Sequence, residues 1–336
     1  MLSELGVRLP KLWLWPLERK RLMSKVLVVG GAGYVGGYLT DLALEQGHEV
    51  RVFDKLLYED AYLKDVDFHF GDILDRHALK THLNWADTVV WLAAVVGDPA
   101  CALNPELTIN TNVNSLKSLV ADYSGRIIFL STCSIYGAQL GLLTEESPFD
   151  PLSLYAESKI AAEKVLLESL NEVLIFRLGT LFGLSDTYSR IRVDLVLNVL
   201  TIRAVQEGHM SVFGGQQYRP LLHVRDVATA VVPQIDTKAT GVYNLHAENM
   251  TIIQLAERIK KLVPSATIEI TESSFQDARN YMVSTDKAAK ELGFKPRWTV
   301  EDGIGEIRDT ISAKRIPKVN IPRFSNVAAL QSQFDN

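Results

Sequence analysis

Cysteine is scarce in this sequence: only Cys101 and Cys133 occur among 336 residues. Their positions match neither the ligand spacing of a zinc site nor a disulfide framework. The sequence therefore predicts no bound metal and a chain suited to a reducing compartment, for which the cytoplasm is the expected location.

Positive charge is not in excess either. The formal net charge is −5, and no stretch combines basic residues with interleaved aromatics, so no nucleic-acid partner is expected and any anionic ligand must be held by local groups. Apolar residues make up 47% and charged residues 22% of the chain, a balance that excludes disordered and fibrous classes and is typical of a folded enzyme.

The N-terminus lacks a long hydrophobic run. The stretch Leu12 to Leu17 carries two tryptophans and a proline before the basic run Glu18 to Arg21. It is too short and interrupted to span a bilayer or act as a signal peptide, and no membrane partner is expected. Residues 1–22 are interpreted as an appendage. A floppy or cloning-derived leader before Met23 is favoured over a peripheral membrane or oligomer contact.

A regular alternation of strands and helices begins at Lys25. The apolar run Val26 to Val29 is followed by a glycine cluster, a helical stretch Val35 to Gln46 and a second run Val50 to Phe53, which is the βαβ pattern. Further strand-like runs occupy residues 66–70, 88–94, 126–130 and 173–178. The predicted fold is therefore α/β, with a Rossmann-type doubly wound parallel sheet.

Gly30, Gly33 and Gly36 form a G-x-x-G-x-x-G series between the first strand and helix. Glycine suits this place because a side chain would obstruct both the sharp turn and the approach of a pyrophosphate, which a helix amino terminus binds through its N–H donors and dipole. A purely structural turn is the alternative, but the βαβ context favours a dinucleotide site.

Asp54 closes the second strand about 20 residues after the glycines. A carboxylate there accepts hydrogen bonds from the adenosine ribose and repels a 2′-phosphate, so NAD is the predicted cofactor in preference to NADP. Lys55 weakens that exclusion, and an exposed turn aspartate is the alternative interpretation.

The regular alternation of strands and helices ends after Gly183. Helical stretches at 195–207 and 252–262 alternate with short strands at 210–213 and 267–270 and predict a smaller mixed α/β C-terminal lobe, with the substrate between the lobes. The predicted division is an appendage 1–22, an NAD-binding Rossmann domain 23–183 with a return segment at about 222–245, a substrate-binding lobe 184–221 plus 246–315, and a C-terminal tail 316–336.

Tyr155 and Lys159 lie four residues apart in a stretch that predicts a helix continuing to Leu170, so they share one face. A tyrosine with an ordinary pKa of about 10 is a poor base, but a nearby ammonium and the positive nicotinamide stabilise the phenolate and lower that pKa. Such pairs also occur on many solvated helix faces, so the pair alone does not indicate catalysis.

The position of Thr132 supports a catalytic role for the Tyr155 and Lys159 pair. Thr132 lies in a run of small hydroxyl residues at the carboxyl end of the strand 126–130, where doubly wound sheets carry their chemistry. A hydroxyl there can donate to the substrate oxygen as hydride moves. For Ser131 and Ser134 in the same run, a strand cap or turn remains an equal alternative.

Seven motifs occur in order along the chain: the glycine series, Gly71-Asp72, Leu92-Ala93-Ala94, Asn112 within Asn110 to Ser115, Thr132 to Gly137, Tyr155-x-x-x-Lys159, and Arg219 to Val227. Together they resemble the extended short-chain dehydrogenase/reductase family, in its NAD-dependent nucleotide-sugar epimerase/dehydratase branch. The resemblance covers roughly residues 25–310 and is specific for the superfamily but not for one substrate.

This resemblance implies that Tyr155 is the catalytic base, that Lys159 binds the nicotinamide ribose and tunes Tyr155, and that Thr132 orients the reacting hydroxyl. Arg219 and Arg279 would lie against the substrate diphosphate, a role that the donor fork of arginine suits, with a surface ion pair as the alternative.

The same resemblance implies a full set of contacts. The residues expected to bind the cofactor are Gly30, Gly33, Tyr34, Val35, Asp54, Asp72, Ile73, Leu92, Ala93, Ala94, Asn112, Tyr155 and Lys159. The residues expected to bind the nucleoside-diphosphate sugar are Thr132, Ser134, Thr180, Asp194, Val212, Arg219 and Arg279.

Departures from the motifs of this branch reduce the number of candidate reactions. Dehydratases follow the threonine with Asp-Glu and decarboxylases carry a glutamate in the same turn, whereas Cys133 and Ser134 stand here, and neither is a carboxylate acid/base. Cys133 is offset by one residue from the cysteine of enzymes that invert C3 and C5, so it is interpreted as a packing residue.

Asp54 then favours an epimerase acting at C4 through a transient 4-keto sugar, with hydride returned, over a 4-ketoreductase that draws on NADPH. Thr180 stands where the best-known galactose 4-epimerases have an asparagine, so neither the sugar nor the nucleotide base is assigned.

Two alternatives of other kinds stay open. A non-catalytic NAD-binding sensor or scaffold is disfavoured because Thr132, Tyr155 and Lys159 are all present, and an enzyme for neutral carbonyl substrates is disfavoured by the two arginines. The resemblance also implies a homodimer, formed by helices from residues 103–124 and 155–170.

Overall fold

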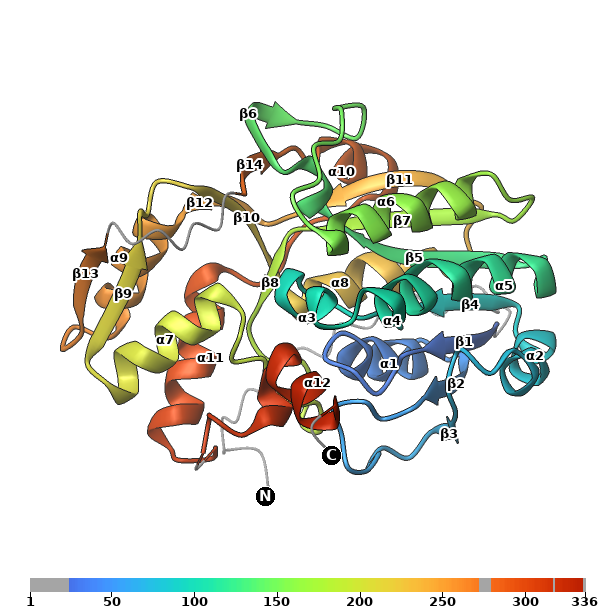
Figure 1. Cartoon of the computed structure of the whole chain (residues 1–336), viewed down its shortest axis with the longest axis horizontal. Helices are drawn as coiled ribbons and strands as arrows, with labels where there is room; N and C mark the ends of the chain where they lie inside the picture. Colours follow the sequence, from blue (N-terminus) through green and yellow to red (C-terminus); the bar gives the residue numbers. More distant parts are fainter. Residues whose placement is uncertain (1–23, 272–278, 317, 335–336) are drawn as a thin grey trace, which may run out of the picture.

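The structure, a computed structural model, describes residues 24–271, 279–316 and 318–334. Its centre is a seven-stranded sheet in the order β11-β7-β5-β4-β1-β2-β3, with all neighbouring strands parallel (Figure 1). The strands are β1 (Lys25–Val29), β2 (Glu49–Asp54), β3 (Asp67–Phe70), β4 (Thr88–Trp91), β5 (Arg126–Thr132), β7 (Val173–Leu178) and β11 (Gly241–Leu245). The order reverses between β1 and β4, where doubly wound folds bind ligands. The predicted Rossmann-type sheet is confirmed.

Helices cover both faces of this sheet. Leu39 of α1 and Val227 of α8 pack into the core of one face, while Leu83 of α2, Leu116 of α5 and Leu166 of α6 pack into the core of the other. These helices are α1 (Gly36–Glu45), α2 (Arg76–Trp85), α5 (Ser115–Asp122), α6 (Leu154–Leu167) and α8 (Val224–Val231). The strands are sandwiched, which explains why they read as continuous apolar runs.

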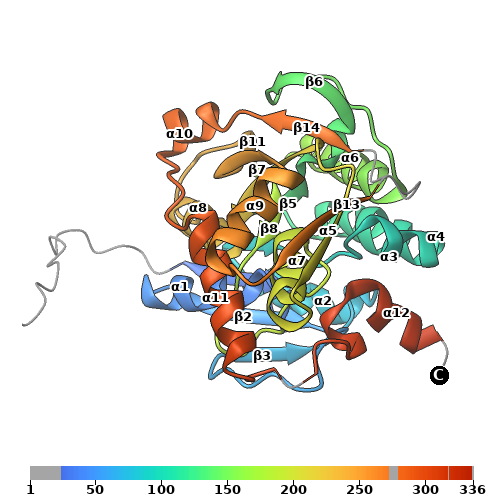
Figure 2. The same ribbon diagram turned by 90° about the vertical axis from the view of Figure 1, so that its left-hand side faces the viewer.

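A smaller lobe lies beside the carboxyl ends of the strands (Figures 1 and 2). Its apolar core joins Leu200, Met210, Leu255 and Ile304, each from a different element. Its elements are α7 (Val196–Gln206), β9 (His209–Phe213), α9 (Ile252–Leu262), β13 (Thr267–Thr271) and α11 (Val300–Ser312), with β9 and β13 parallel. The helices and strands predicted near 195–207, 210–213, 252–262 and 267–270 are all present.

Two small strand sets join the lobes. β10 pairs in parallel with β8 and antiparallel with β12, and β14 pairs with β6. Their bounds are β6 (Ala138–Leu143), β8 (Thr180–Phe182), β10 (Tyr218–His223), β12 (Glu248–Thr251) and β14 (Asn280–Val283). The chain therefore passes between the lobes several times.

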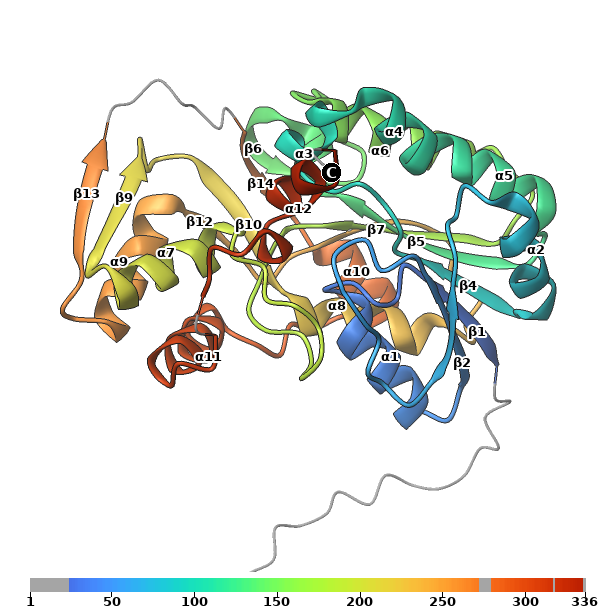
Figure 3. The same ribbon diagram turned by 60° about the horizontal axis from the view of Figure 1, so that its bottom comes forward.

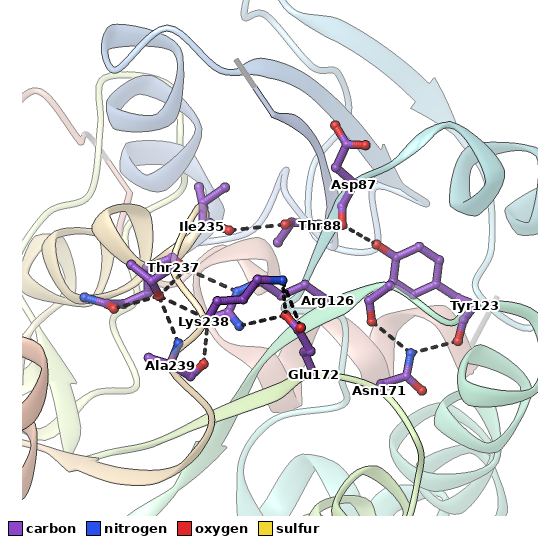
Figure 4. A network of polar contacts seen from close by, with 12 residues as sticks. Asp87, Thr88, Tyr123, Arg126, Asn171, Glu172, Ile235, Thr237, Lys238 and Ala239 are labelled. Carbon is purple, nitrogen blue, oxygen red and sulfur yellow. Dashed lines mark hydrogen bonds and ion pairs between the residues drawn. The ribbon is translucent and has the colours of Figure 1, made fainter. Parts of the chain in front are cut away.

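Arg126 anchors the amino end of the sheet, the end away from the ligand side (Figure 4). This buried side chain donates to the carbonyl oxygens of Gln234 at 3.2 Å and Ala239 at 2.7 Å, and Glu172 lies 3.9 Å away. Glu172 also pairs with the exposed Lys238 at 2.9 Å. The network ties β5 to the segment that leads into β11.

The structure differs from the sequence-based expectations at several element ends. The strand predicted to reach residue 94 ends at Trp91, because the backbone N–H groups of Leu92 and Ala93 both turn to the carbonyl oxygen of Val29. The helix expected over 103–124 is divided into α3 (Asp98–Leu103), α4 (Pro105–Ile109), a π-helical turn Asn110–Asn114 and α5.

The C-terminal tail, which carried no predicted element, contains a 3-10 turn Pro322–Phe324 and the helix α12 (Asn326–Phe334). A further helix, α10 (Asp286–Leu292), follows β14. The appendage 1–22 lies outside the described residues. None of the described helices combines the length and apolar character needed to cross a membrane.

Candidate active site

The glycine series forms the turn between β1 and α1. Gly30 has a φ of +82°, and a Cβ on it would lie 2.5 Å from the backbone nitrogen of Ala93, so the position requires glycine. A Cβ on Gly36 would lie 2.2 Å from the carbonyl oxygen of Gly31. Gly33 borders the cavity described below. The turn thus presents backbone rather than side chains to the ligand space.

Asp54 ends β2 at the border of the same cavity. Its carboxylate accepts backbone N–H bonds from Ala32 at 3.0 Å and from Leu56 at 2.7 Å, which fixes its orientation. Burial raises the pKa of this carboxyl above its usual value. The Nζ of Lys55 lies 3.0 Å from the Asp72 carboxylate, so the neighbouring positive charge is paired.

β5 and α6 bring the three predicted catalytic residues to one wall of the cavity. Thr132 ends β5, and Tyr155 and Lys159 follow one turn apart near the start of α6, which Ser153 caps with its hydroxyl oxygen. Lys159 is buried, and its Nζ donates to the carbonyl oxygen of Leu130 at 2.9 Å. The helix period therefore places both α6 side chains against the end of β5.

Burial is the main influence on the pKa values of Tyr155 and Lys159. Desolvation raises the pKa of Tyr155 well above its ordinary value, and a hydrogen bond with Thr132 opposes that shift. Desolvation lowers the pKa of Lys159 to about 8. The protein's own groups thus keep the phenol protonated, so the lowered tyrosine pKa expected from the sequence depends on the charge of a bound nicotinamide.

Asn112 lies behind the wall and does not border the cavity. This buried side chain accepts from the backbone N–H of Val95 at 2.8 Å and donates to its carbonyl oxygen at 2.9 Å. Its amide also donates to Ser158 Oγ at 3.0 Å. It joins the loop after β4 to α6 from a π-helical turn, a distortion that often marks functional sites.

Arg219 and Arg279 enter the cavity from the smaller lobe. Arg219 is buried and donates to the carbonyl oxygens of Tyr218 and Arg279. The guanidinium of Arg279 lies 3.4 Å from Ser134 Oγ and 3.4 Å from the carboxylate of Asp98. The arginine pair therefore reaches the end of the cavity where Ser134 accepts a hydrogen bond from Thr132.

A buried ion pair supports the end of β5 from behind. Arg177 Nη2 lies 2.7 Å from the Glu163 carboxylate, and Ser131 Oγ donates to the same carboxylate at 2.5 Å. The Cys133 thiol is fully buried and donates to the Arg177 carbonyl oxygen at 3.2 Å, and burial raises its pKa. These contacts agree with the interpretation of Cys133 as a packing residue.

One cavity of about 1090 Å³ joins these groups. Every predicted cofactor or substrate residue except Asn112 lines it, and it runs from the glycine turn to the smaller lobe. The predicted residues on its wall are Gly30, Gly33, Tyr34, Val35, Asp54, Asp72, Ile73, Leu92, Ala93, Ala94, Thr132, Ser134, Tyr155, Lys159, Thr180, Asp194, Val212, Arg219 and Arg279.

The cavity wall also contains residues that sequence reasoning missed. Arg190, Arg192 and Arg203 line it, and so do Asp98 and residues 325–327 of the C-terminal segment. Arg190 and Arg192 flank an isoleucine just before the predicted Asp194, and two arginines so close to a candidate ligand were an available signal. The polar C-terminal segment offered none.

A dinucleotide turn, a Tyr-x-x-x-Lys pair beside a strand-end threonine and a second lobe closing one cavity define an enzyme of the extended short-chain dehydrogenase/reductase class. Comparison with known proteins makes the assignment narrower. The sequence profile of the NAD dependent epimerase/dehydratase family matches residues 26–245, and the chain belongs to that family.

Two characterised relatives share less than a third of their residues with this chain. UDP-glucuronic acid decarboxylase 1 of Arabidopsis thaliana is 27% identical over 310 residues, covering 86% of this chain and 69% of that protein. UDP-glucose 4-epimerase of Halalkalibacterium halodurans is 29% identical over 309 residues, covering 81% of this chain and 91% of that protein. The chain is thus similar to enzymes of two different reactions.

Solved structures share the fold. UDP-glucose 4-epimerase of Thermotoga maritima superposes with a TM-score of 0.76 at 22% identity, covering 87% of this chain and 99% of that chain. UDP-glucuronic acid 4-epimerase of Bacillus cereus superposes with a TM-score of 0.75 at 24% identity, covering 86% of this chain and 99% of that chain.

Proposed function

We propose that this chain is an NAD-dependent nucleotide-sugar epimerase that inverts C4 of the sugar through a transient 4-keto sugar. The observation that carries the proposal is the single cavity. It places the glycine turn and Asp54, the wall of Thr132, Tyr155 and Lys159, and the arginines of the smaller lobe around one space. Family membership independently supports dinucleotide-dependent chemistry on a sugar nucleotide.

The residues of the larger lobe fit a dinucleotide. The Gly30 turn exposes backbone close to α1, and Asp54 offers a fixed carboxylate suited to two ribose hydroxyls. Ile73 and the Leu92 to Ala94 stretch add apolar walls. NAD bound there would take up the C4 hydrogen as hydride and return it to the opposite face, so that the net reaction is an epimerisation.

Tyr155 is the proposed acid/base. It accepts the proton of the C4 hydroxyl as the sugar is oxidised and returns that proton to the carbonyl oxygen when the sugar is reduced, so no proton is gained or lost overall. Thr132, which shares a hydrogen bond with Tyr155, orients the same oxygen. Lys159 supplies positive charge beside the nicotinamide ribose.

The smaller lobe is proposed to hold the rest of the substrate. Arg219 and Arg279 provide donor forks for the diphosphate, and Val212 and Asp194 border the space for the nucleotide base. Thr180 lines the same cavity. The assignment of these residues is a hypothesis from their position in the cavity and from the family resemblance.

Decarboxylation of a nucleotide-linked uronic acid is the second candidate, because a plant relative carries that name. Oxidation at C4 makes such a sugar a β-keto acid, which loses carbon dioxide without a carboxylate base. The residues beside Thr132 give little basis for choosing between epimerase and decarboxylase. Cys133 is buried in the core, and Ser134 offers only a hydroxyl to the cavity.

The decisive experiment incubates the purified protein with NAD or NADP and a panel of UDP-, GDP-, CDP- and dTDP-sugars, including a uronic acid. NADH absorbance and the NMR spectrum of the sugar are followed together. We expect a C4 epimer with no net NADH and a preference for NAD. A pentose with carbon dioxide would establish the decarboxylase, and net consumption of NADPH with 4-keto sugars only would establish a 4-ketoreductase. NAD binding without any turnover would favour the sensor hypothesis.

A homodimer and a cytoplasmic location remain predictions. The dimer is supported by exposed apolar side chains on the helices expected at its interface, Leu103 and Ile109 on one side and Leu167 on α6. Light scattering at increasing protein concentration tests it, and a monomer at all concentrations would contradict it.

A further inference from the structure

The C-terminal segment of residues 318–334, called the strap below, contributes part of the cavity wall. α12 packs beside α3 (Figure 3). Ser325, Asn326 and Val327 line the cavity. The rest of that wall comes from residues between Gly30 and Arg279, outside the strap. The strap therefore closes a site that is built by other elements.

Asn326 is the polar centre of the strap and is buried. Its Oδ1 accepts from Arg190, its Nδ2 donates to the Val96 carbonyl oxygen at 2.9 Å, and its backbone N–H donates to Asp194 at 2.8 Å. One residue thus joins the loop after β4 to the segment that leads into α7.

The partners of Asn326 face the ligand space. Arg190 and Asp194 line the cavity, and Asp194 holds Arg192, another cavity residue, in a two-contact ion pair at 2.6 and 3.1 Å. The charge of Arg192 also acts on Tyr155. Asn326 therefore sets the position of charged groups that a ligand meets.

The strap also completes the apolar surroundings of the proposed acid/base. Leu330 of α12 belongs to the same buried cluster as Tyr155, Val95 and Cys101, and Val327 packs against it. Displacing the strap would expose this cluster and admit water to the wall that carries Tyr155.

Some buried polar atoms beside the strap have no hydrogen-bond partner among the described residues. Arg190 Nε, Arg323 Nε and the Tyr58 hydroxyl are buried beneath or within the strap without a hydrogen-bond partner among the described residues. Unpaired buried donors oppose closure, because they regain hydrogen bonds to water when the strap lifts. Against this, Arg323 pairs with the Glu59 carboxylate, Leu330 is buried, and Gln333 donates to the Leu57 carbonyl oxygen at 2.8 Å. The strap therefore combines contacts that hold it closed with unpaired donors that favour its opening.

We propose that the strap is the closing element of the active site, with Asn326 as a positioning residue for Arg190 and Asp194, and that its opening limits the release of bound dinucleotide. The inference rests on the proposed function, since it assigns the dinucleotide to this cavity. Closure also retains the oxidised sugar until it has been reduced again, which an epimerase requires.

The test compares Asn326→Ala with Gln331→Ala, which removes an exposed side chain from the same helix. Release of NADH is measured by mixing the complex with excess NAD and following NADH fluorescence. We expect release from Asn326→Ala to be roughly tenfold faster than from the wild type, and release from Gln331→Ala to be unchanged. Asn326→Asp keeps an acceptor for Arg190 and is expected to release NADH more slowly than Asn326→Ala.

Hydrogen–deuterium exchange supplies a readout that needs no ligand. In the protein alone, residues 318–334 are expected to exchange faster in Asn326→Ala than in Gln331→Ala, while exchange in β5 and α6 stays unchanged. Normal NADH binding with equal release rates would overturn the inference alone. Failure of the wild type to bind NADH would overturn the proposed function and this inference with it.

Discussion

At the scale of single residues, Tyr155 combines two roles that substitution can separate. Its ring belongs to a buried apolar cluster and its hydroxyl faces the cavity wall with Thr132. Tyr155→Phe keeps the ring, so NADH affinity should stay within a few-fold while kcat falls by roughly 10²–10⁴. Tyr188→Phe, at a half-exposed tyrosine, is the matched control. Steady-state kinetics on the sugar found in the panel measure both, and a kcat within a few-fold of wild type would remove Tyr155 from the mechanism.

Lys159 carries a stability cost that depends on pH. Burial lowers its pKa to about 8 in the folded protein, so between that pH and the usual lysine range the folded protein binds fewer protons than the unfolded chain. The free energy of unfolding contributed by this group therefore rises with pH across that window and is lowest below it.

Lys159→Met removes this dependence. In protein without ligand, the stability of the wild type relative to Lys159→Met should rise by about 2 kcal/mol between about pH 7 and pH 10. Urea unfolding at both pH values measures it. Lys164→Met, at an exposed lysine of the same helix, controls for the loss of a charge. A gap between wild type and Lys159→Met that is the same at both pH values would show that burial does not perturb this amine.

Features that depend on neighbouring residues could be predicted from the sequence, and contacts between distant parts of the chain could not. Tyr155 and Lys159 were found because the helix period alone puts them on one face, and Gly30 because a strand-to-helix turn demands it. Asn326 was not found, because its partners Arg190 and Val96 lie 136 and 230 residues away. Nothing local distinguishes an asparagine that bridges loops from one in a solvated tail.

At the scale of elements, buried strands were predicted best. β5 and β7 are buried along their whole length, and a continuous apolar run records that burial directly in the sequence. β6 was missed because most of its residues are exposed and it gains its order from pairing with β14, far along the chain. α12 was missed for the same reason, since its order comes from docking.

Arg126 offers a stability test of the amino end of the sheet. Arg126→Ala leaves the carbonyl oxygens of Gln234 and Ala239 without their buried donor, so the free energy of unfolding should fall by roughly 1–3 kcal/mol. Lys238→Ala breaks only the exposed pair with Glu172 and should change it by less than about 0.5 kcal/mol.

Chemical unfolding measures both variants, and kcat serves as the control because the network lies away from the cavity. Equal stability of Arg126→Ala and Lys238→Ala would show that the buried contacts of Arg126 contribute no more than a surface ion pair.

At the scale of the whole molecule, the two lobes are interleaved rather than joined by one linker. β10 hydrogen-bonds to β8 and β12, and β14 pairs with β6, so each lobe needs strands from several separate stretches of the chain. The two small strand sets that join the lobes cannot form while either lobe is unfolded. Cooperative unfolding of the two lobes is the expectation from this connectivity.

A ligand that fills the cavity should then stabilise both lobes at once. Binding to the folded state alone adds RT ln(1 + [L]/Kd) to the free energy of unfolding, about 2.7 kcal/mol at a hundredfold excess of ligand over Kd. We expect one calorimetric transition without ligand and one transition at higher temperature with NADH. Two transitions, of which NADH moves only the first or the second, would show that the lobes unfold independently and that the dinucleotide contacts a single lobe. Adding the nucleotide sugar to the NADH complex should raise the single transition further, because its proposed contacts, Arg219 and Arg279, line the same cavity.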